Sequence, residues 1–337
     1  MSPPVLTSIS QRVLPVLQLT RMALVFTAIA DSMCGLLLRA ASQRPPGGRL
    51  IEHIDKYQLV ATAIISVGLY GYGMSLNDII DRRRDSQIAS HRPLPSGRIG
   101  VVTAHVICGL LALGALLGGA YFVYAGVPNG WATVLLVVAT GLLITFYDTA
   151  GKYLVAPGLI SLGLIRFFHC VIPAPEMPVL WHPLLLLNHV AILSTVAYVW
   201  EQKRPNLTPL HWWTVLGMLG FIDLAAVGLS AWQRPAAFWI LRGLLYPCAA
   251  VVVFVAVAFV IRRQMGQRRE AGQTLMLYGL LWLIVYDAAF AYAYVNWLAA
   301  LLLLMLMPVA YLSVQLMRWW SKLLTASQRP EYRRAGV

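Results

Sequence analysis

The chain has 337 residues, of which 59% are hydrophobic and 12% are charged, and its mean hydropathy is +0.70. This composition excludes a soluble globular surface and predicts a protein whose main solvent is lipid. The formal net charge of +13 would suit nucleic acid, but the basic residues lie in short loops and at the termini without a nucleic-acid-binding signature, so we expect no nucleic-acid partner.

Ten segments are long and apolar enough to cross the hydrocarbon core of a bilayer, which needs about 20 residues in a helix. We expect helices because backbone polar groups in lipid must be satisfied within the segment, and the alternation typical of barrel strands is missing. The sequence therefore predicts an all-α, polytopic transmembrane helix bundle of nine or ten spans, forming one integral membrane domain over residues 1–337. The expected spans are 13–37, 57–80, 100–122, 130–149, 154–172, 183–200, 212–231, 237–261, 273–293 and 296–317.

Basic residues predict the orientation of the bundle, because cytoplasmic loops are enriched in Lys and Arg. With the N-terminus inside, the cytoplasmic segments hold 18 of the 26 basic residues, including a short basic tail over about 321–337. The loop at 38–56 departs from this pattern, since it places four basic residues on the outer side. An even number of spans puts both termini in the cytoplasm. The cytoplasmic basic residues are Arg12, Arg82, Arg83, Arg84, Arg92, Arg98, Lys152, Lys203, Arg204, Arg262, Arg263, Arg268, Arg269, Arg318, Lys322, Arg329, Arg333 and Arg334.

The second predicted span runs into the polar stretch Asn77-Asp78-Ile79-Ile80-Asp81-Arg82-Arg83-Arg84-Asp85. On a helix, Asn77, Asp81 and Asp85 lie four residues apart on one face, and Asp78 lies beside Asp81. A cluster of carboxylate and amide oxygens at a membrane boundary suits a Mg²⁺ ion that also binds a diphosphate. The alternative is a solvated helix end in which three arginines neutralise three aspartates. The spacing favours the metal-binding face.

The pattern NDxxDxxxD at the end of this span resembles the first aspartate-rich motif of the UbiA superfamily of intramembrane prenyltransferases. The segment that follows, His91-Arg92-Pro93-Leu94-Pro95-Ser96-Gly97-Arg98, is similar to the RPLPSG-type segment that this family commonly carries at the same place. The two motifs together are far more specific than either alone. The hydrophobic layout also agrees with the family over most of the chain.

This resemblance implies a UbiA-like bundle that transfers a prenyl group from a prenyl diphosphate to an acceptor within the bilayer. Arg92 and Arg98 would neutralise the diphosphate oxygens, because the planar guanidinium donates two hydrogen bonds at once. The equal alternative is that both are ordinary basic residues of a cytoplasmic loop. The residues that the resemblance implies as Mg²⁺ ligands are Asn77, Asp78, Asp81 and Asp85, the three aspartates being catalytic.

The fourth predicted span ends in Thr145-Phe146-Tyr147-Asp148-Thr149-Ala150-Gly151-Lys152. A tyrosine followed by a lysine at this place resembles a weaker family feature, although the spacing here is one residue longer. The resemblance makes Tyr147 and Lys152 candidate substrate-binding residues, and Asp148 could supply or orient a ligand. Interfacial anchoring of Tyr147 and Lys152 is the alternative.

Polar side chains also lie inside predicted spans, where a charge costs about 2.5–3.5 kcal/mol on insertion scales. Arg166 should therefore face a polar interior or an acidic partner, either to bind the diphosphate or as a structural pair. His169, three residues later, is expected to be a satisfied core histidine. Three acids could each pair with a nearby basic group: Asp31, Asp223 and Asp287. The cysteines are scattered singly without CxxC spacing and are expected to be packing residues: Cys34, Cys108, Cys170 and Cys248.

The end of the sixth predicted span departs from the family, whose second aspartate motif would hold a second Mg²⁺. The sequence there is Tyr198-Val199-Trp200-Glu201-Gln202-Lys203-Arg204-Pro205-Asn206. Either Glu201 is a catalytic metal ligand, with Tyr198 on the same helix face binding substrate, or the chain is a non-catalytic prenyl-lipid-binding protein. The DxxDGxxAR signature of the CDP-alcohol phosphotransferases, a rival class, is absent. We predict a Mg²⁺-dependent prenyltransferase.

Overall fold

A computed structural model describes residues 13–45, 48, 50–233 and 241–327, which form helices and connecting loops and, within these ranges, no strand. Nine helical segments of the described chain are long and apolar enough to span a membrane, and α7 is a shorter apolar helix. The all-α, polytopic bundle is thus confirmed, and each of the ten predicted spans overlaps one of these helices. They are α2 (Val25–Gln43), α3 (Lys56–Ile80), α5 (Val101–Tyr124), α6 (Gly130–Thr149), α7 (Val155–Val171), α8 (Trp181–Trp200), α9 (Pro209–Gln233), α11 (Leu245–Gln264), α12 (Arg268–Tyr294), and α13 (Trp297–Leu304) together with α14 (Leu306–Ser327).

The first span begins later than the sequence predicts. Residues 13–19 are helical, but the helix is interrupted at Arg21, whose φ of 47° is left-handed. The membrane-length segment is Met22–Gln43, in which the short helix η1 (Met22–Leu24) leads into α2. Arg21 donates a hydrogen bond to Asp78 on α3, and this contact accompanies the interruption.

Two other predicted boundaries differ in the C-terminal third of the chain. The eighth predicted span starts at residue 237, whereas α11 starts at Leu245; residues 237–240 lie outside the described residues. The predicted tail starts at about residue 321, but α14 continues to Ser327. The remaining tail residues, 328–337, are likewise outside the described part.

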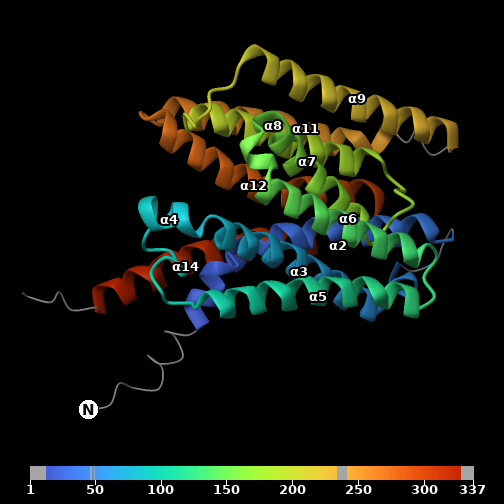
Figure 1. Ribbon diagram of the computed structural model, residues 1–337. Helices are drawn as coiled ribbons and strands as arrows, with labels where there is room; N and C mark the ends of the chain where they lie inside the picture. The colour runs from blue at the N-terminus through green and yellow to red at the C-terminus, as the bar shows by residue number, and fades with distance from the viewer. Residues whose placement is uncertain (1–12, 46–47, 49, 234–240, 328–337) are drawn as a thin grey trace, which may run out of the picture.

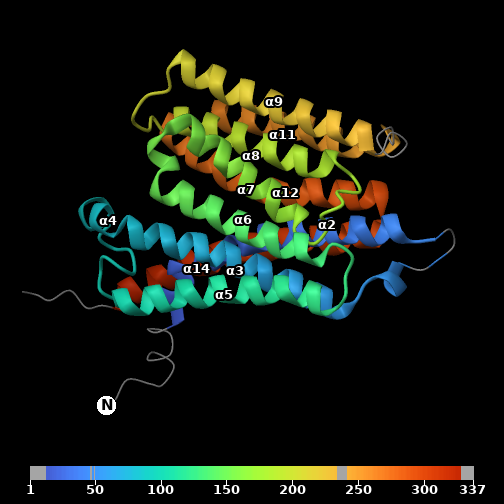
Figure 2. The ribbon, with the colours of Figure 1, turned by 45° about the vertical axis from the view of Figure 1, so that its right-hand side comes forward.

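The helices lie side by side along one common direction (Figures 1 and 2). α9 forms one edge of the bundle and α5 the opposite edge, with α2, α7 and α12 between them (Figures 1 and 2). Burial agrees with this order. In Met22–Gln43, 61% of the most apolar 18-residue stretch is buried, whereas in Pro209–Trp232 the share is only 11%. The central helices therefore form the interior, and the outer helices present apolar side chains to lipid.

One end of the bundle gathers the segments that the sequence places on the cytoplasmic side. The end of α3, the short helix α4 (Arg82–Ile88) and the end of α14 lie together there, at the left of Figure 1. The polar motif at the α3–α4 junction is therefore at this end. The assignment of this end to the cytoplasm remains a prediction from the basic residues.

Small residues allow neighbouring helices to approach closely. A Cβ atom added to Gly68 of α3 would lie 2.6 Å from the carbonyl oxygen of Leu111 and 2.8 Å from the nitrogen of Ala115 on α5. A Cβ added to Gly35 of α2 would lie 2.2 Å from the Cys170 carbonyl oxygen on α7. Helices in lipid associate through such packing, because burial against a neighbour brings no hydrophobic gain over lipid.

This packing predicts that Gly68→Ala destabilises the bundle, because the added methyl group would contact the backbone of α5, which cannot move as a flexible side chain can. We expect a loss of about 1–3 kcal/mol, the usual cost of overpacking. Gly109→Ala is the matched control, since Gly109 is an exposed glycine of α5 with nothing within 4 Å of an added Cβ. Thermal unfolding in detergent would measure both, and equal melting temperatures would contradict the close α3–α5 contact.

Candidate functional site

The predicted aspartate face forms where α3 passes into α4. α3 ends at Ile80, Asp81 joins the two helices, and α4 begins at Arg82. The helical hydrogen bonds continue through the junction, since the Asp81 N–H donates to the Asn77 carbonyl at 2.9 Å and the Asp85 N–H to the Asp81 carbonyl at 2.8 Å. The predicted spacing of four residues is thus kept in three dimensions, and the three aspartates remain on one side.

Basic side chains from three separate segments contact these aspartates. Arg21, which precedes η1, lies 3.2 Å from Asp78 Oδ1. Arg92, in the loop after α4, lies 2.6 Å from Asp85 Oδ2 and 3.6 Å from Asp78 Oδ1. Asp78 and Asp85 are each only 4% exposed. Their charges are therefore compensated by guanidinium groups rather than by bulk water.

Lys152 compensates the third aspartate. It follows α6 in the turn η3 (Gly151–Tyr153), and its Nζ lies 2.7 Å from Asp81 Oδ1. Asn77 lies beside this pair; with its amide nitrogen turned toward the carboxylates, it donates to Asp148 Oδ1 at 3.1 Å and to Asp81 Oδ2 at 3.3 Å. The ends of α3 and α6 are therefore joined by an amide, two carboxylates and an ammonium group.

The sequence did not predict two residues of this cluster as principal site residues. Asp148, 2% exposed, was considered only as an additional ligand, and the structure places it against Asn77. Arg21 was missed entirely. The available signal was a cation inside the first predicted span, which should seek an acidic partner, but its position 57 residues before Asp78 gave no local clue to which acid.

The structure does not bring the other predicted site residues into this cluster. Arg98 donates to Ser96 Oγ at 3.0 Å, to Gln18 Oε1 at 2.9 Å and to the His91 carbonyl, so it braces the loop after α4. Tyr147, next to Asp148, is within electrostatic reach of Asp81 and Arg21.

Arg166 lies deeper in the bundle, away from the aspartate face. Its guanidinium pairs with Asp31 Oδ2 at 2.6 Å and donates to Thr27 Oγ1 at 3.1 Å. Of the two roles open from the sequence, the structure shows the ion pair, which joins α7 to α2.

The residues at the end of α8 contact their own surroundings. Tyr198 donates to the Pro205 carbonyl at 2.7 Å. Glu201 caps the C-terminus of α8, pairs with Lys203 at 3.1 Å, and contacts the start of α12 at Gly272. Within the described part of the chain, the ion pairs of the aspartate face do not include Glu201.

The donor set of the aspartate face fits Mg²⁺. Carboxylate and amide oxygens are the ligands that this ion prefers. Four carboxyl groups face three cations in the ion pairs and hydrogen bonds described above, so with all four ionised the cluster carries one excess negative charge, which a metal ion would compensate. The residues able to contribute oxygen are Asn77, Asp78, Asp81, Asp85 and Asp148.

No family model matches the sequence, and a search of curated proteins finds no match either. Solved structures match in fold. A structure of digeranylgeranylglyceryl phosphate synthase has a TM-score of 0.58 and 18% identity, covering 83% of this chain and 98% of that chain. A UbiA homolog from Archaeoglobus fulgidus has a TM-score of 0.50 and, bound to GPP and Mg²⁺, 0.52; both have 14% identity and cover 82% of this chain and 99% of the homolog.

These similarities establish the class of fold. The chain is a polytopic membrane protein with the architecture of the UbiA homologs, as its aspartate motif and the segment after it indicated. At these identities the agreement concerns the fold. The activity must be argued from the residues of this chain.

The site predicts a specific cost for removing Lys152. Its side chain and that of Asp81 are only 12% and 13% exposed, so Lys152→Gln should leave a poorly solvated carboxylate and lower the unfolding free energy on the order of 2 kcal/mol. Lys203→Gln is the control, because Lys203 is 49% exposed in its pair with Glu201 and should cost about 0–1 kcal/mol. Melting in detergent with a metal chelator would compare them; a Lys152 variant as stable as the control would show that the Asp81 pair is not buried.

Proposed function

We propose that this protein transfers a prenyl group from a prenyl diphosphate to an acceptor within the bilayer and depends on Mg²⁺. The convergence of four carboxylates with Arg21, Arg92 and Lys152 at one end of the bundle carries the proposal. A membrane-embedded anionic cluster with adjoining cations can bind a metal and a diphosphate together, because each cation that leaves a carboxylate becomes available for a phosphate oxygen.

The proposed roles follow from the contacts. Asn77, Asp78, Asp81 and Asp85 would hold Mg²⁺, which when bound stabilises the negative charge that develops on the departing diphosphate. Arg92 and Lys152 would move from the aspartates to the diphosphate oxygens, Arg92 through two donors and Lys152 as a point charge. Arg21, absent from the sequence-based set, is placed to do the same beside Asp78.

The reaction itself breaks the bond between the allylic carbon and the diphosphate oxygen. The acceptor attacks that carbon and loses a proton, while the basic side chains retain the diphosphate. The apolar interior of the bundle excludes water from the cation-like carbon. The UbiA homolog of similar fold was solved with GPP and Mg²⁺, which supports a prenyl diphosphate and this metal as the ligands to test.

The remaining residues that were predicted to bind substrate would first have to give up existing hydrogen bonds. Arg98, Arg166 and Tyr198 each donate hydrogen bonds to protein groups, so binding substrate would require them to exchange these partners. Tyr147 directly precedes Asp148 at the end of α6, so it is next in sequence to a residue of the cluster. We therefore rank Tyr147 above the other three as a further substrate contact.

A second candidate function is a non-catalytic protein that binds prenyl lipids. The observation that favours it is Glu201, which stands where a second aspartate motif would be expected and pairs with Lys203. If diphosphate departure needs a second metal, this end of α8 offers a single carboxylate for it. Both candidate proteins would bind a prenyl diphosphate, but only the prenyltransferase would turn it over.

Asp78→Asn and Asp81→Asn should each abolish Mg²⁺-dependent binding of geranyl diphosphate, because replacing a carboxylate by an amide removes negative charge from a hard-cation site. Stability should also fall, for Asp81→Asn on the order of 2 kcal/mol as for Lys152→Gln, because the buried Lys152 loses its partner, so binding is measured well below the melting temperature of each variant. Glu270→Gln is the control, because Glu270 is an exposed acid in the first turn of α12. Labelled-ligand binding and melting would be measured on the same samples. Full affinity in both aspartate variants would show that the aspartates form only a charged helix end and do not bind the metal.

Glu201 is proposed as the ligand of a second metal, and its variants separate the two candidate functions. Glu201→Gln should then abolish turnover of a radiolabelled prenyl diphosphate while Mg²⁺-dependent binding at the first motif persists, and Glu201→Asp should impair turnover by drawing the oxygens back. Lys203→Gln controls for loss of the ion pair alone. Turnover in Glu201→Gln equal to that of the unaltered protein would exclude the metal role, and an unaltered protein that binds donors without turning any over would favour the non-catalytic candidate.

A further inference from the structure

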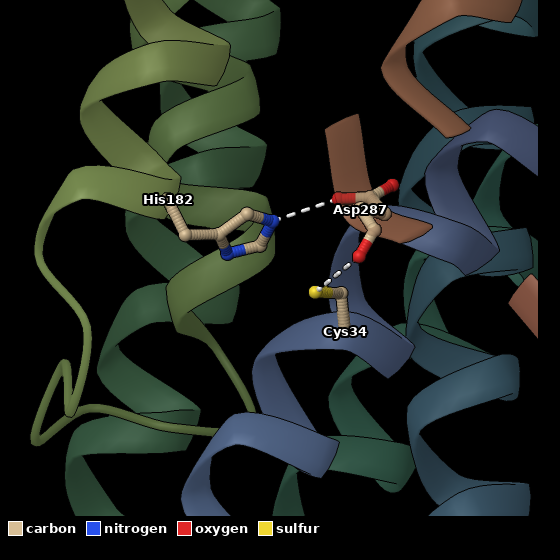
Figure 3. Close-up of side chains that lie close together, drawn as sticks. All are labelled: Cys34, His182 and Asp287. Carbon is tan, nitrogen blue, oxygen red and sulfur yellow. Dashed lines mark hydrogen bonds and ion pairs between the residues drawn. The ribbon is translucent and has the colours of Figure 1, made fainter. Parts of the chain in front are cut away.

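A second group of potential metal ligands lies inside the bundle, apart from the aspartate face. It consists of Cys34 from α2, His182 from α8 and Asp287 from α12 (Figure 3). One ligand atom from each lies within 4.8 Å of the others, and the three residues are 0%, 1% and 0% exposed. His182 is the second residue of α8 and Glu201 follows its last, so this group lies toward the end of the bundle opposite the aspartate face.

The hydrogen bonds within this group do not use every atom that could bind a metal ion. His182 Nε2 lies 2.7 Å from Asp287 Oδ1, and the Cys34 thiol donates to the Asp287 backbone carbonyl at 3.4 Å (Figure 3). The second carboxylate oxygen of Asp287, Oδ2, is buried and receives no hydrogen bond from a protein donor group, although the Asp31 carboxyl interacts with the same carboxyl group. A buried carboxylate oxygen without a partner is costly, and it is rare unless a ligand or ion satisfies it.

The balance of charges around Asp287 also suggests a missing cation. The Asp31 carboxyl interacts directly with that of Asp287, and Asp31 Oδ1 is also without a partner. Arg166 compensates one of these two carboxylates through its 2.6 Å contact with Asp31. With a neutral His182 and both carboxyls ionised, one negative charge remains in the interior, where it is expensive.

We propose that Cys34, His182 and Asp287 bind a Zn²⁺ ion that ties α2, α8 and α12 together. Thiolate, imidazole and carboxylate are the ligands of Zn²⁺, whereas Mg²⁺ prefers oxygen alone. Binding replaces the thiol proton of Cys34, which is released to solvent, so the ion with one thiolate adds a net single positive charge and balances the remaining carboxylate.

Two arrangements without a metal would balance the same charge: a protonated His182 paired with Asp287, and one proton shared between the carboxyls of Asp31 and Asp287. The first leaves Asp287 Oδ2 without a partner, and neither gives the Cys34 thiol a part. The zinc site uses both groups. It is also independent of prenyl transfer, because none of its ligands belongs to the aspartate face.

The test measures metal directly in the purified, full-length protein. After equilibration with Zn²⁺ and removal of free metal, elemental analysis should find one zinc per chain, and Co²⁺ in its place should give a thiolate-to-cobalt charge-transfer absorption. Cys34→Ser and His182→Gln should lower the zinc affinity by at least about 10–100-fold, the effect of losing even an outer partner of a metal ligand. Cys108→Ser is the matched control, since Cys108 is also buried and its thiol faces only the Tyr72 carbonyl at 3.8 Å.

Two results would overturn the site: no zinc retained by folded, unaltered protein, or equal retention in Cys34→Ser and Cys108→Ser. The cobalt absorption of the unaltered protein keeps the test valid if a ligand variant fails to fold, because a missing thiolate band alone excludes Cys34 as a ligand. Asp78→Asn should retain zinc in full. Loss of Mg²⁺-dependent binding and loss of zinc would therefore be separate outcomes.

Discussion

A carboxylate inside a helix bundle surrounded by lipid needs a cation, a hydrogen-bond donor or a metal ion beside it, because no bulk water is available to solvate its charge. The interior of this protein is organised around that requirement. Asp78, Asp81 and Asp85 meet basic groups from three segments, Asp31 meets Arg166, and Asp223 accepts from Asn188. Three of these contacts join segments that are distant in the sequence: Arg21 with Asp78 (57 residues apart), Lys152 with Asp81 (71) and Arg166 with Asp31 (135). Polar compensation therefore connects parts of the bundle that are far apart along the chain.

Close backbone packing complements these polar contacts. Gly35 brings α2 against α7 next to Cys34, and Gly68 brings α3 against α5 below the aspartate face. Where two backbones approach this closely, the helices cannot slide without a clash, so the depth of each polar residue is set. The ligand groups at both ends of the interior are therefore held by rigid helices rather than by loops, which suits a site that must keep its geometry.

The two ends of the interior offer different chemistry. The aspartate face presents oxygen donors with Arg and Lys side chains beside them, and the proposed binding of Mg²⁺ and a diphosphate rests on this arrangement. The opposite group presents one sulfur, one nitrogen and one oxygen donor, which are ligand types of Zn²⁺ and would leave its fourth position open. Glu201 belongs to neither group, and its pairing with Lys203 is the feature that distinguishes this chain from the pattern its first motif resembles.

The sequence by itself determined the number and type of the spans and the spacing of the aspartates, because both depend on local quantities: the length of an apolar run and the four-residue period of a helix. It also singled out Arg92 and Lys152, which lie close to motifs in the sequence and form ion pairs with Asp85 and Asp81 in the structure; their binding of substrate stays a prediction. The partners of Arg21, Arg98 and Arg166, and the meeting of Cys34, His182 and Asp287, are shown only by the tertiary structure. Cys34 and Asp287 are 253 residues apart, and helical periodicity carries no information on which faces of two distant helices pack together. That choice is made by close packing and charge compensation over the whole bundle, which a single sequence does not display.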